Sequence, residues 1–427
     1  MQKGSNSTQF PLRICIVGAG LGGLAAALSL RRQGHQVEIL ETSQMKREIG
    51  AAITVQFNAM RVLEYLGYDP QNLQGVETFG TVRYSAVGGE GTTQPLLYKD
   101  PKERVSGLFT TGVPLEHTQA CWTTLRSDLH DELRRLATEE EGSGPPAKLH
   151  LGTRVIECDP VEGVLKLKNG ETREADLIIG ADGIHSTIRT HVLGYEQKAL
   201  PSGISTFRCL FNADKLDELP DMEWFTKGIT GARIVLSPEE RFHMLFLSPC
   251  RRGKIVNVVA HHTDDRDPDK HDWDQPATVE EVVEEFKTFH PRYLNFLEQG
   301  EQPILKWQLR ALPLLPTWIN GRTALLGDAA HATLPTLGQG ASMAIEDAAA
   351  IGCLIPLGTQ RADIPARLEA YQELRKSRGE YVNRASLEQA VQPAKRGLYG
   401  RSEEQQTFLM GYDAVQSAQK YFQEHFC

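Results

Sequence analysis

Residues 14–24 read Ile-Cys-Ile-Val-Gly-Ala-Gly-Leu-Gly-Gly-Leu, an apolar run that ends in a glycine-rich turn. Alanine and leucine dominate the residues that follow, so the turn joins a buried strand to a helix. This is the context of the dinucleotide fingerprint Gly-x-Gly-x-x-Gly. Gly18 permits the tight turn, Gly20 lets a pyrophosphate approach the backbone, and Gly23 lets the helix pack closely on its strand. The N-terminus of the helix offers free N–H groups and partial positive charge to the phosphates.

The fingerprint also predicts an acidic residue that binds a ribose. Glu41 follows the next apolar strand, residues 37–40, and lies 23 residues after Gly18. An acidic side chain about 20 residues beyond the first glycine is typical of dinucleotide-binding folds. The N-terminal part of the chain therefore binds a dinucleotide, and its type depends on motifs further along.

A second glycine motif, Gly-Asp-Ala-Ala-His at residues 327–331, distinguishes a flavin from a nicotinamide nucleotide. It follows an apolar strand at 324–326, and small residues through Ala341 lead into a helix that we expect to begin near Ser342. A third motif, Asp-Leu-Ile-Ile-Gly-Ala-Asp-Gly-Ile-His-Ser-Thr-Ile-Arg, occupies residues 176–189. The downstream motifs exclude a plain nicotinamide-dependent dehydrogenase.

These three motifs, in this order, resemble those of the single-component FAD monooxygenases, which include salicylate hydroxylase and para-hydroxybenzoate hydroxylase. The resemblance covers about residues 14–351 and is greatest to fungal and bacterial salicylate-hydroxylase-like members. It implies an α/β fold with a Rossmann-like FAD-binding domain, an inserted and mostly antiparallel β-sheet substrate domain, and C-terminal helices. The strand-like runs at 204–211, 232–236, 242–247 and 254–260 favour the antiparallel sheet, and residues 278–289 predict an amphipathic helix.

The inserted sheet makes the FAD-binding domain discontinuous. We expect that domain at residues 10–79, 103–196 and 305–356, and the substrate domain at 80–102 and 197–304. Residues 357–427 would form a C-terminal helical segment.

Individual FAD contacts follow from the resemblance. Asp328 would bind the ribityl chain and Arg126 would contact FAD, although most members have histidine where this chain has Leu125. Residues 335–341 would pass the isoalloxazine ring, and the next helix would point its N-terminus at the pyrimidine edge, where negative charge gathers on reduction. Residues 47–52 resemble a segment near the ribose and flavin. The candidate FAD-binding residues are Gly18, Gly20, Gly23, Glu41, Arg47, Ala52, Arg126, Asp182, Asp328, Gly340 and Ala341.

The sequence contains one dinucleotide fingerprint, so the resemblance implies that NADH or NADPH binds transiently and reduces a non-covalent FAD. Reduced FAD would react with O2 to form a C4a-hydroperoxide, which delivers an electrophilic hydroxyl group to an electron-rich aromatic ring. The protein must exclude water from this species and raise the electron density of the ring. Stabilising a phenolate is the simplest way to achieve the second requirement.

Arg208 is the first candidate for holding that phenolate, because arginine stays charged in a dry pocket. It matches the arginine with this task in fungal phenol-dearomatising members, and its alternative role is that of a sheet-surface arginine. His243 and Arg241, on a neighbouring strand, are further candidates for holding the substrate oxygen. We expect His261 and His262 to be solvated and His331 to be structural.

Composition narrows the class further. The net charge of −9, from 46 Lys and Arg against 55 Asp and Glu, argues against a nucleic-acid partner. Seven dispersed cysteines without a Cys-x-x-Cys pair favour reduced thiols. The polar N-terminus is unlike a signal peptide, and no apolar stretch approaches the roughly 20 residues that span a bilayer. We expect a cytoplasmic monomer or homodimer without a metal site or membrane contact, whose partners are a small aromatic substrate, O2 and NAD(P)H.

Other functions remain open at this point. An FAD-dependent epoxidase of an alkene or indole would share all three motifs, and so would an enzyme that dearomatises a phenol. A non-catalytic FAD-fold binding protein is a more distant alternative. A flavin-dependent halogenase would share the first motif but usually carries Trp-x-Trp-x-Ile-Pro, which this sequence lacks.

Overall fold

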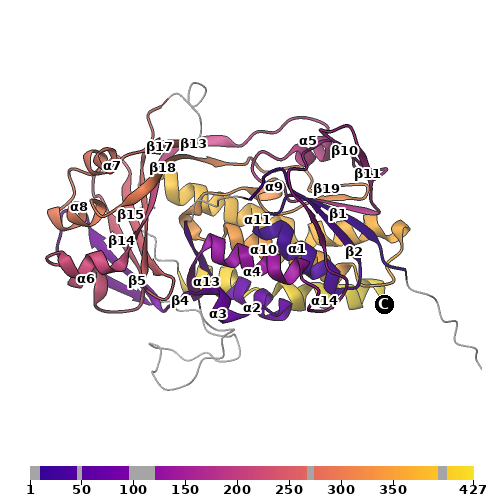
Figure 1. Cartoon of the computed structure of the whole chain (residues 1–427), viewed down its shortest axis with the longest axis horizontal. Helices are drawn as coiled ribbons and strands as arrows, with labels where there is room; N and C mark the ends of the chain where they lie inside the picture. Colours follow the sequence, from indigo (N-terminus) through magenta and orange to yellow (C-terminus); the bar gives the residue numbers. More distant parts are fainter. Residues whose placement is uncertain (1–9, 46–50, 96–120, 267–273, 393–401) are drawn as a thin grey trace, which may run out of the picture.

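The computed structural model describes residues 10–45, 51–95, 121–266, 274–392 and 402–427. Within them, two large sheets lie toward opposite ends of an elongated molecule, and long helices fill one of these ends (Figure 1). One sheet has six strands and carries the glycine-rich turn. The other has eight strands and belongs mainly to the middle of the chain.

The six-stranded sheet is parallel except at one edge. Its strands, in spatial order, are β19 (Ile319–Asn320), β20 (Thr323–Leu325), β12 (Leu177–Gly180), β1 (Arg13–Val17), β2 (Gln36–Leu40) and β8 (Lys148–His150), with only β19 antiparallel to its neighbour. Its central strands are continuous apolar runs because both faces of a parallel sheet are covered. α1 (Leu21–Arg32) packs against both α4 (Arg126–Thr138) and α10 (Gly340–Leu354).

The turn between β1 and α1 requires glycine at two positions. Gly18 has φ +101°, and a Cβ atom there would lie 2.4 Å from the carbonyl oxygen of Ala181. A Cβ atom on Gly23 would lie 2.0 Å from the carbonyl oxygen of Gly18. Both positions therefore exclude any side chain. A Cβ atom on Gly20 would meet nothing within 4 Å, so this backbone is open to a ligand.

The eight-stranded sheet has antiparallel pairs throughout, apart from the parallel pair β14–β5. Its spatial order is β17 (Asp274–Ala277), β18 (Glu301–Ala311), β13 (Leu200–Asn212), β16 (Ile255–Thr263), β15 (His243–Cys250), β14 (Gly231–Leu236), β5 (Gly80–Ser85) and β6 (Thr92–Pro95). All four strand-like runs expected from the sequence are strands. β18 crosses the domain boundary expected at residue 304 because it pairs with β13 as far as Ala311.

Three short helices cover one face of this sheet (Figure 1), namely α6 (Glu223–Thr226), α7 (Val279–Glu285) and α8 (Pro291–Leu297). The aromatic side chains of Phe211, Phe286 and Phe296 have no exposed surface in the core between the sheet and these helices. The expected helix at 278–289 is shorter than predicted, since α7 ends at Glu285. The opposite face of the sheet is left to line a cavity.

Smaller elements connect these parts. One three-stranded sheet contains β3 (Ala52–Val55), β7 (Cys121–Leu125) and β4 (Val76–Thr78), and another contains β9 (Val155–Asp159), β10 (Val164–Leu167) and β11 (Thr172–Glu174). The remaining helices are α2 (Phe57–Leu66), α3 (Pro70–Leu73), α5 (Thr187–Leu193), α9 (Asp328–His331), α11 (Ile364–Val391), α13 (Glu403–Met410) and α14 (Ala414–Phe426). Pro365 lies in the first turn of α11 and does not break it.

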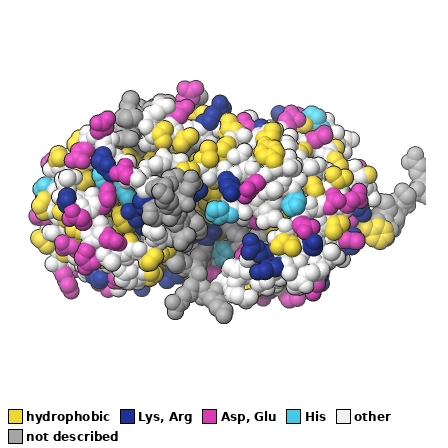
Figure 2. All heavy atoms as spheres, turned by 90° about the horizontal axis from the view of Figure 1, so that it is seen from above, with side chains coloured by type: hydrophobic (Ala, Val, Ile, Leu, Met, Phe, Trp, Pro, Cys, Tyr) yellow, Lys and Arg dark blue, Asp and Glu magenta, His cyan; other side chains and the backbone are white. Residues whose placement is uncertain are grey.

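Acidic and basic side chains are interspersed over the face shown in Figure 2. Among the described residues, no helix combines the length and apolar character needed to cross a lipid bilayer.

Candidate functional site

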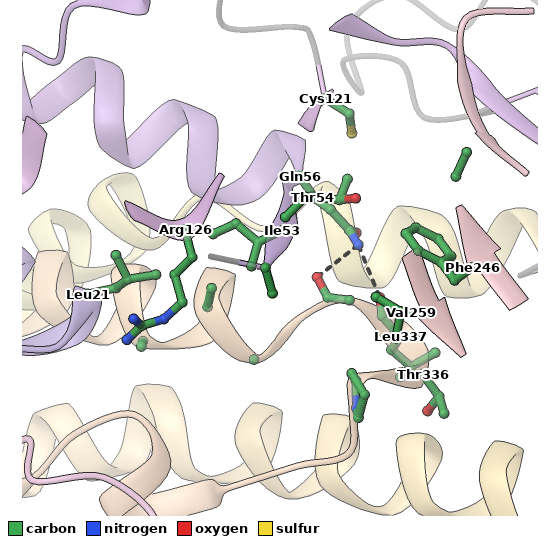
Figure 3. Close-up of a pocket in the computed structure, with 18 of the residues that line it drawn as sticks. Leu21, Ile53, Thr54, Gln56, Cys121, Arg126, Phe246, Val259, Thr336 and Leu337 are labelled. Carbon is green, nitrogen blue, oxygen red and sulfur yellow. Dashed lines mark hydrogen bonds between the residues drawn. The ribbon is translucent and has the colours of Figure 1, made fainter. Parts of the chain in front are cut away.

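A cavity of about 510 Å³ extends from the glycine-rich turn to the uncovered face of the eight-stranded sheet. It lies outside the carboxyl ends of β1, β12 and β20, where α/β sheets bind their ligands. Arg126 lies toward one end and Phe246 and Val259 toward the other (Figure 3). The cavity brings together seven residues singled out from the sequence, which are Gly20, Ala52, Arg126, Arg208, Asp328, Gly340 and Ala341.

The dinucleotide end is built by backbone and one carboxylate. Glu41 accepts hydrogen bonds from the backbone N–H of Ala19 at 2.8 Å and of Ser43 at 2.7 Å. It therefore stands beside the glycine turn and fixes the end of β2 to it. Gly18 and Gly23 pack behind the turn, while Gly20 faces the cavity.

Asp328 and Arg126 place opposite charges at this end of the cavity. The side chain of Asp328 is exposed toward the cavity, yet the surrounding protein desolvates its carboxylate and raises its pKa. The positive charge of Arg126 opposes that increase. Burial lowers the pKa of Arg126 in turn, and Asp328 counteracts this shift. Both groups therefore face the cavity, where a polar ligand can replace the water around them.

Of the expected FAD-binding residues in the described part of the chain, Gly18, Gly23, Glu41 and Asp182 do not themselves line the cavity. The carboxylate of Asp182 accepts hydrogen bonds from the backbone N–H of Thr187 at 2.7 Å and of Ile188 at 3.1 Å, so it caps α5. Its neighbours Ala181 and Gly183 line the cavity instead. Arg47 lies outside the described residues.

The loop at 335–339 is held against the cavity by buried amides. Nε2 of Gln56 donates to the carbonyl oxygens of Leu337 and Gly338, both at 3.0 Å (Figure 3). Gln339 in turn donates to Oε1 of Gln56 at 2.6 Å and accepts from Asn58 at 2.9 Å. These bonds position the start of α10, whose positive N-terminal end therefore faces the cavity.

The same helix is anchored below the cavity by a buried ion-pair cluster. Glu346 and Asp347 of α10 pair with Arg375 and Arg378 of α11, and none of the four side chains is more than 4% exposed. Nε2 of His331 lies 2.7 Å from Asp347, which gives this histidine the structural role expected from the sequence.

Arg208 dominates the other end of the cavity. It projects from β13 on the same face as Thr206, with its guanidinium carbon 5.0 Å from the ring centroid of Trp307. Among the described residues, no carboxylate forms an ion pair with it and its Nε has no hydrogen-bond partner. Burial lowers its pKa to about 10, helped by the charge of Arg126, so Arg208 stays cationic at neutral pH.

Apolar side chains surround this cation. Ile234, Met244, Phe246 and Val259 line the sheet end of the cavity from three neighbouring strands. Such walls suit an aromatic ring and keep water from its oxygen substituent.

His243 is a wrong prediction for this site. Its Nε2 lies 2.9 Å from Oε1 of Glu285 in α7, and its ring packs against Phe286. It therefore lies on the helix-covered face of the sheet. Alternation along β15 is the reason, because Met244 and Phe246 point into the cavity and His243 points the other way.

His261 and His262 also differ from the expectation that they are solvated, since both are buried. His261 lines the cavity, whereas Nδ1 of His262 bonds to the carbonyl oxygen of Thr263 on the opposite face. Strand alternation could have separated the two residues, but not shown which face meets the cavity. Gln56, and Gln406 and Met410 of α13, are further cavity residues without a local sequence signal.

Comparison with known proteins decides the family. The family model described as an FAD binding domain matches residues 12–386, and hispidin-3-hydroxylase of Neonothopanus nambi is 43% identical over 418 residues, with 96% of each chain covered. The chain belongs to the FAD-dependent monooxygenases. Salicylate hydroxylase of Pseudomonas putida is 31% identical, with 88% of this chain and 85% of the relative covered. The crystal structure of CtdE with FAD and a substrate has a TM-score of 0.79 at 21% identity, covering 97% and 98% of the chains, and shares the fold.

The α/β fold of this FAD-dependent monooxygenase, with its antiparallel sheet, agrees with the fold class predicted from the sequence. The described site fits its cofactor in three ways. The glycine turn leaves open backbone at Gly20, the carboxylate of Asp328 faces the cavity, and the first residues of α10, Gly340 and Ala341, line it.

Proposed function

We propose that this enzyme hydroxylates a phenolic ring that Arg208 binds as its phenolate, with NADH or NADPH as the electron donor and O2 as the oxidant. The observation that carries the proposal is the cation of Arg208, which forms no ion pair among the described residues and lies in a mostly apolar part of the cavity without a carboxylate. Arg208 is half-buried, and a guanidinium in such surroundings favours an anionic partner. Neither the described strands of the sheet nor the described helices that cover it provide one. A phenolate supplies that charge on the ring that must be electron-rich.

We further propose which residues hold FAD. The turn Gly18–Gly23 would receive the pyrophosphate, Glu41 a ribose and Asp328 the ribityl chain. Arg126, Ala52, Gly340 and Ala341 all line the cavity and would border the flavin ring. Bound FAD, once reduced, would activate O2. The carboxylate of Asp182 is already used by α5, so we do not retain it as a contact.

The protein's side chains would stabilise the negative charge of the substrate, orient its ring and exclude water from it. Arg208 would stabilise the deprotonated hydroxyl group, which raises the electron density at the ring carbon that is attacked. Phe246, Met244 and Val259 would hold the ring plane and exclude water.

Epoxidation of an alkene is the second candidate, and Arg208 argues against it. An alkene offers no anion to a buried guanidinium, so its binding would leave the cation uncompensated. We also propose a reducing compartment such as the cytoplasm, since all seven cysteines are free thiols and six of them are buried.

The test is a screen for substrate-accelerated NAD(P)H oxidation with product analysis by mass spectrometry. The panel contains hispidin, salicylate, 3-hydroxybenzoate and 6-hydroxynicotinate, which are named in the relatives' activities, together with simple phenols and a terminal alkene. We expect a phenol or other ring with an acidic hydroxyl group to gain one oxygen atom. Acceptance of the alkene alone would refute the proposal.

Arg208→Ala should keep FAD but lose about 30- to 1000-fold in kcat/KM on the accepted compound, as expected for removal of a charge contact in the transition state. Arg208→Lys should not restore full activity, because a point charge cannot reproduce the planar pairing. Arg241→Ala is the matched control, since Arg241 does not line the cavity as the sequence suggested. It lies on the exposed surface and pairs with Asp265 at 2.6 Å. Wild-type turnover by Arg208→Ala would contradict the proposed role.

A further inference from the structure

His261 is a second polar group at the sheet end of the cavity that the proposed hydroxylation does not use. It lies on β16, is only 4% exposed and lines the cavity. Its Nδ1 has no hydrogen-bond partner among the described residues. A buried nitrogen of this kind costs stability unless water or a ligand satisfies it.

The sheet register places His261 beside Arg208. Thr206 is directly opposite His261, and Arg208 is the next residue of β13 on the same face. The two side chains are therefore diagonal neighbours on adjacent strands, whose Cα atoms are typically about 7–8 Å apart. A single small ring lying on this face can reach both.

The two groups differ in charge. Burial lowers the pKa of His261 to about 3, and the positive charge of Arg208 contributes to the shift. His261 is therefore neutral over the working pH range, with one ring nitrogen that donates a hydrogen bond and one that accepts. It suits an uncharged oxygen, whereas Arg208 suits an anionic one.

The other two buried histidines of this sheet have protein partners for one nitrogen. Nε2 of His243 faces Glu285 at 2.9 Å, and Nδ1 of His262 bonds to the carbonyl oxygen of Thr263 at 2.8 Å. The nitrogen that each leaves unpaired is on the helix-covered side. Only for His261 does the unpaired nitrogen, among described residues, belong to a side chain that lines the cavity.

We propose that His261 binds a second, uncharged oxygen of the substrate, so that the enzyme selects rings with two oxygen groups, one anionic at Arg208 and one hydroxyl or carbonyl at His261. This inference rests on the proposed role of Arg208 in phenolate binding. A ring without the second oxygen would displace water from His261 and leave its nitrogen unsatisfied. Sites built to bind a hydroxyl group reject analogues that lack it for this reason.

The experiment uses FAD-loaded enzyme and two compounds, the substrate accepted in the screen and its analogue with the second oxygen group replaced by methyl. Substrate Kd is measured from the change in flavin absorbance, and kcat/KM from product formation. The variants are His261→Phe, which removes both nitrogens, and His261→Gln, which keeps a donor and an acceptor. His262→Phe is the matched control on the opposite face, and FAD content and Tm report folding.

For the wild type, we expect kcat/KM to be about 10- to 100-fold lower for the methyl analogue than for the substrate, and the analogue to bind with a higher Kd. For His261→Phe, kcat/KM on the two-oxygen substrate should fall by a similar factor, and kcat/KM on the methyl analogue should be no lower than on that substrate. His261→Gln should recover part of the lost kcat/KM. His262→Phe should discriminate between the two compounds as the wild type does.

The inference is overturned if the accepted substrate carries only one oxygen group, or if folded His261→Phe uses both compounds as the wild type does. Either result could occur while Arg208→Ala remains inactive, which would leave the proposed function intact. Wild-type activity of Arg208→Ala would instead remove the premise on which both proposals depend.

Discussion

Arg378→Met should destabilise the enzyme by breaking the ion-pair cluster under α10. Arg378 donates from Nε and Nη2 to the two carboxylate oxygens of Glu346 at 2.8 and 2.9 Å, and Glu346 has no exposed surface. Arg375 pairs with both Glu346 and Asp347. Without Arg378, two buried carboxylates would share one guanidinium and His331. Removing one partner of a buried pair costs about 3–5 kcal/mol.

The effect should reach the cavity. Arg378 also donates to the carbonyl oxygens of Phe408 and Leu409 in α13, at 2.7 and 2.5 Å. That helix contributes Gln406 and Met410 to the cavity wall. The folded fraction of Arg378→Met should therefore show a higher substrate KM than the wild type.

Thermal unfolding of the FAD-loaded enzyme provides the measurement. An unfolding entropy of about 2.1 cal/mol/K per residue amounts to roughly 0.9 kcal/mol/K for 427 residues. The expected loss of stability thus corresponds to a Tm that is roughly 3–6 °C lower. Lys376→Met, which removes a partly exposed pair with Glu380 on the same helix, should change stability by no more than about 0.5 kcal/mol.

A double-mutant cycle separates charge from packing. Glu346→Gln keeps a partner for Asn58 but removes the negative charge, so Glu346→Gln/Arg378→Met should lose less stability than the sum of the single variants. Strict additivity, or an Arg378→Met variant as stable as Lys376→Met, would refute the reasoning.

The stability that this ion-pair cluster contributes should decrease at low pH. Burial opposes ionisation of Glu346 and Asp347, but the neighbouring cations outweigh it and hold both pKa values below their ordinary ones. Such groups stabilise the folded state above their unfolded pKa, near 4, and this contribution is lost as the pH falls through the folded value. The difference in stability between the wild type and Arg378→Met should therefore be complete at pH 7 and decrease below about pH 4.

Two further variants test the site. Asp328→Ala should weaken FAD binding roughly 10- to 150-fold, equivalent to about 1.5–3 kcal/mol for one charge-assisted hydrogen bond, in a titration of apoprotein. Unchanged affinity would exclude Asp328 as a contact, and flavin that stays attached after denaturation would exclude non-covalent binding. His243→Gln should keep kcat/KM near the wild-type value, because its ring faces Glu285 on the helix-covered side, away from the cavity. Loss of turnover by this variant at normal FAD content and Tm would show that the assignment of faces is mistaken.

Local chemistry allowed much of the fold to be predicted from sequence. The turn at residues 18–23 depends on positive φ and on close backbone approach, and both requirements are met only by glycine and are visible in the sequence. Apolar runs and alternation likewise predicted β13 to β16 within a few residues. Asp328 and Arg208 were singled out because the sequence around them resembles that of a known family, and their roles remain proposals.

The features that were not predicted from sequence depend on contacts between segments that lie far apart in the chain. Alternation along a strand separates two faces but does not say which face the helices cover, so His243 was assigned to the cavity and His261 was not. Only the packing of α7 on the sheet resolves this. The amides of Gln56 and Gln339, which hold the loop beside the cavity, are 283 residues apart in the chain. The physical reason is that such partners meet through tertiary packing, and nothing in either local sequence encodes the other.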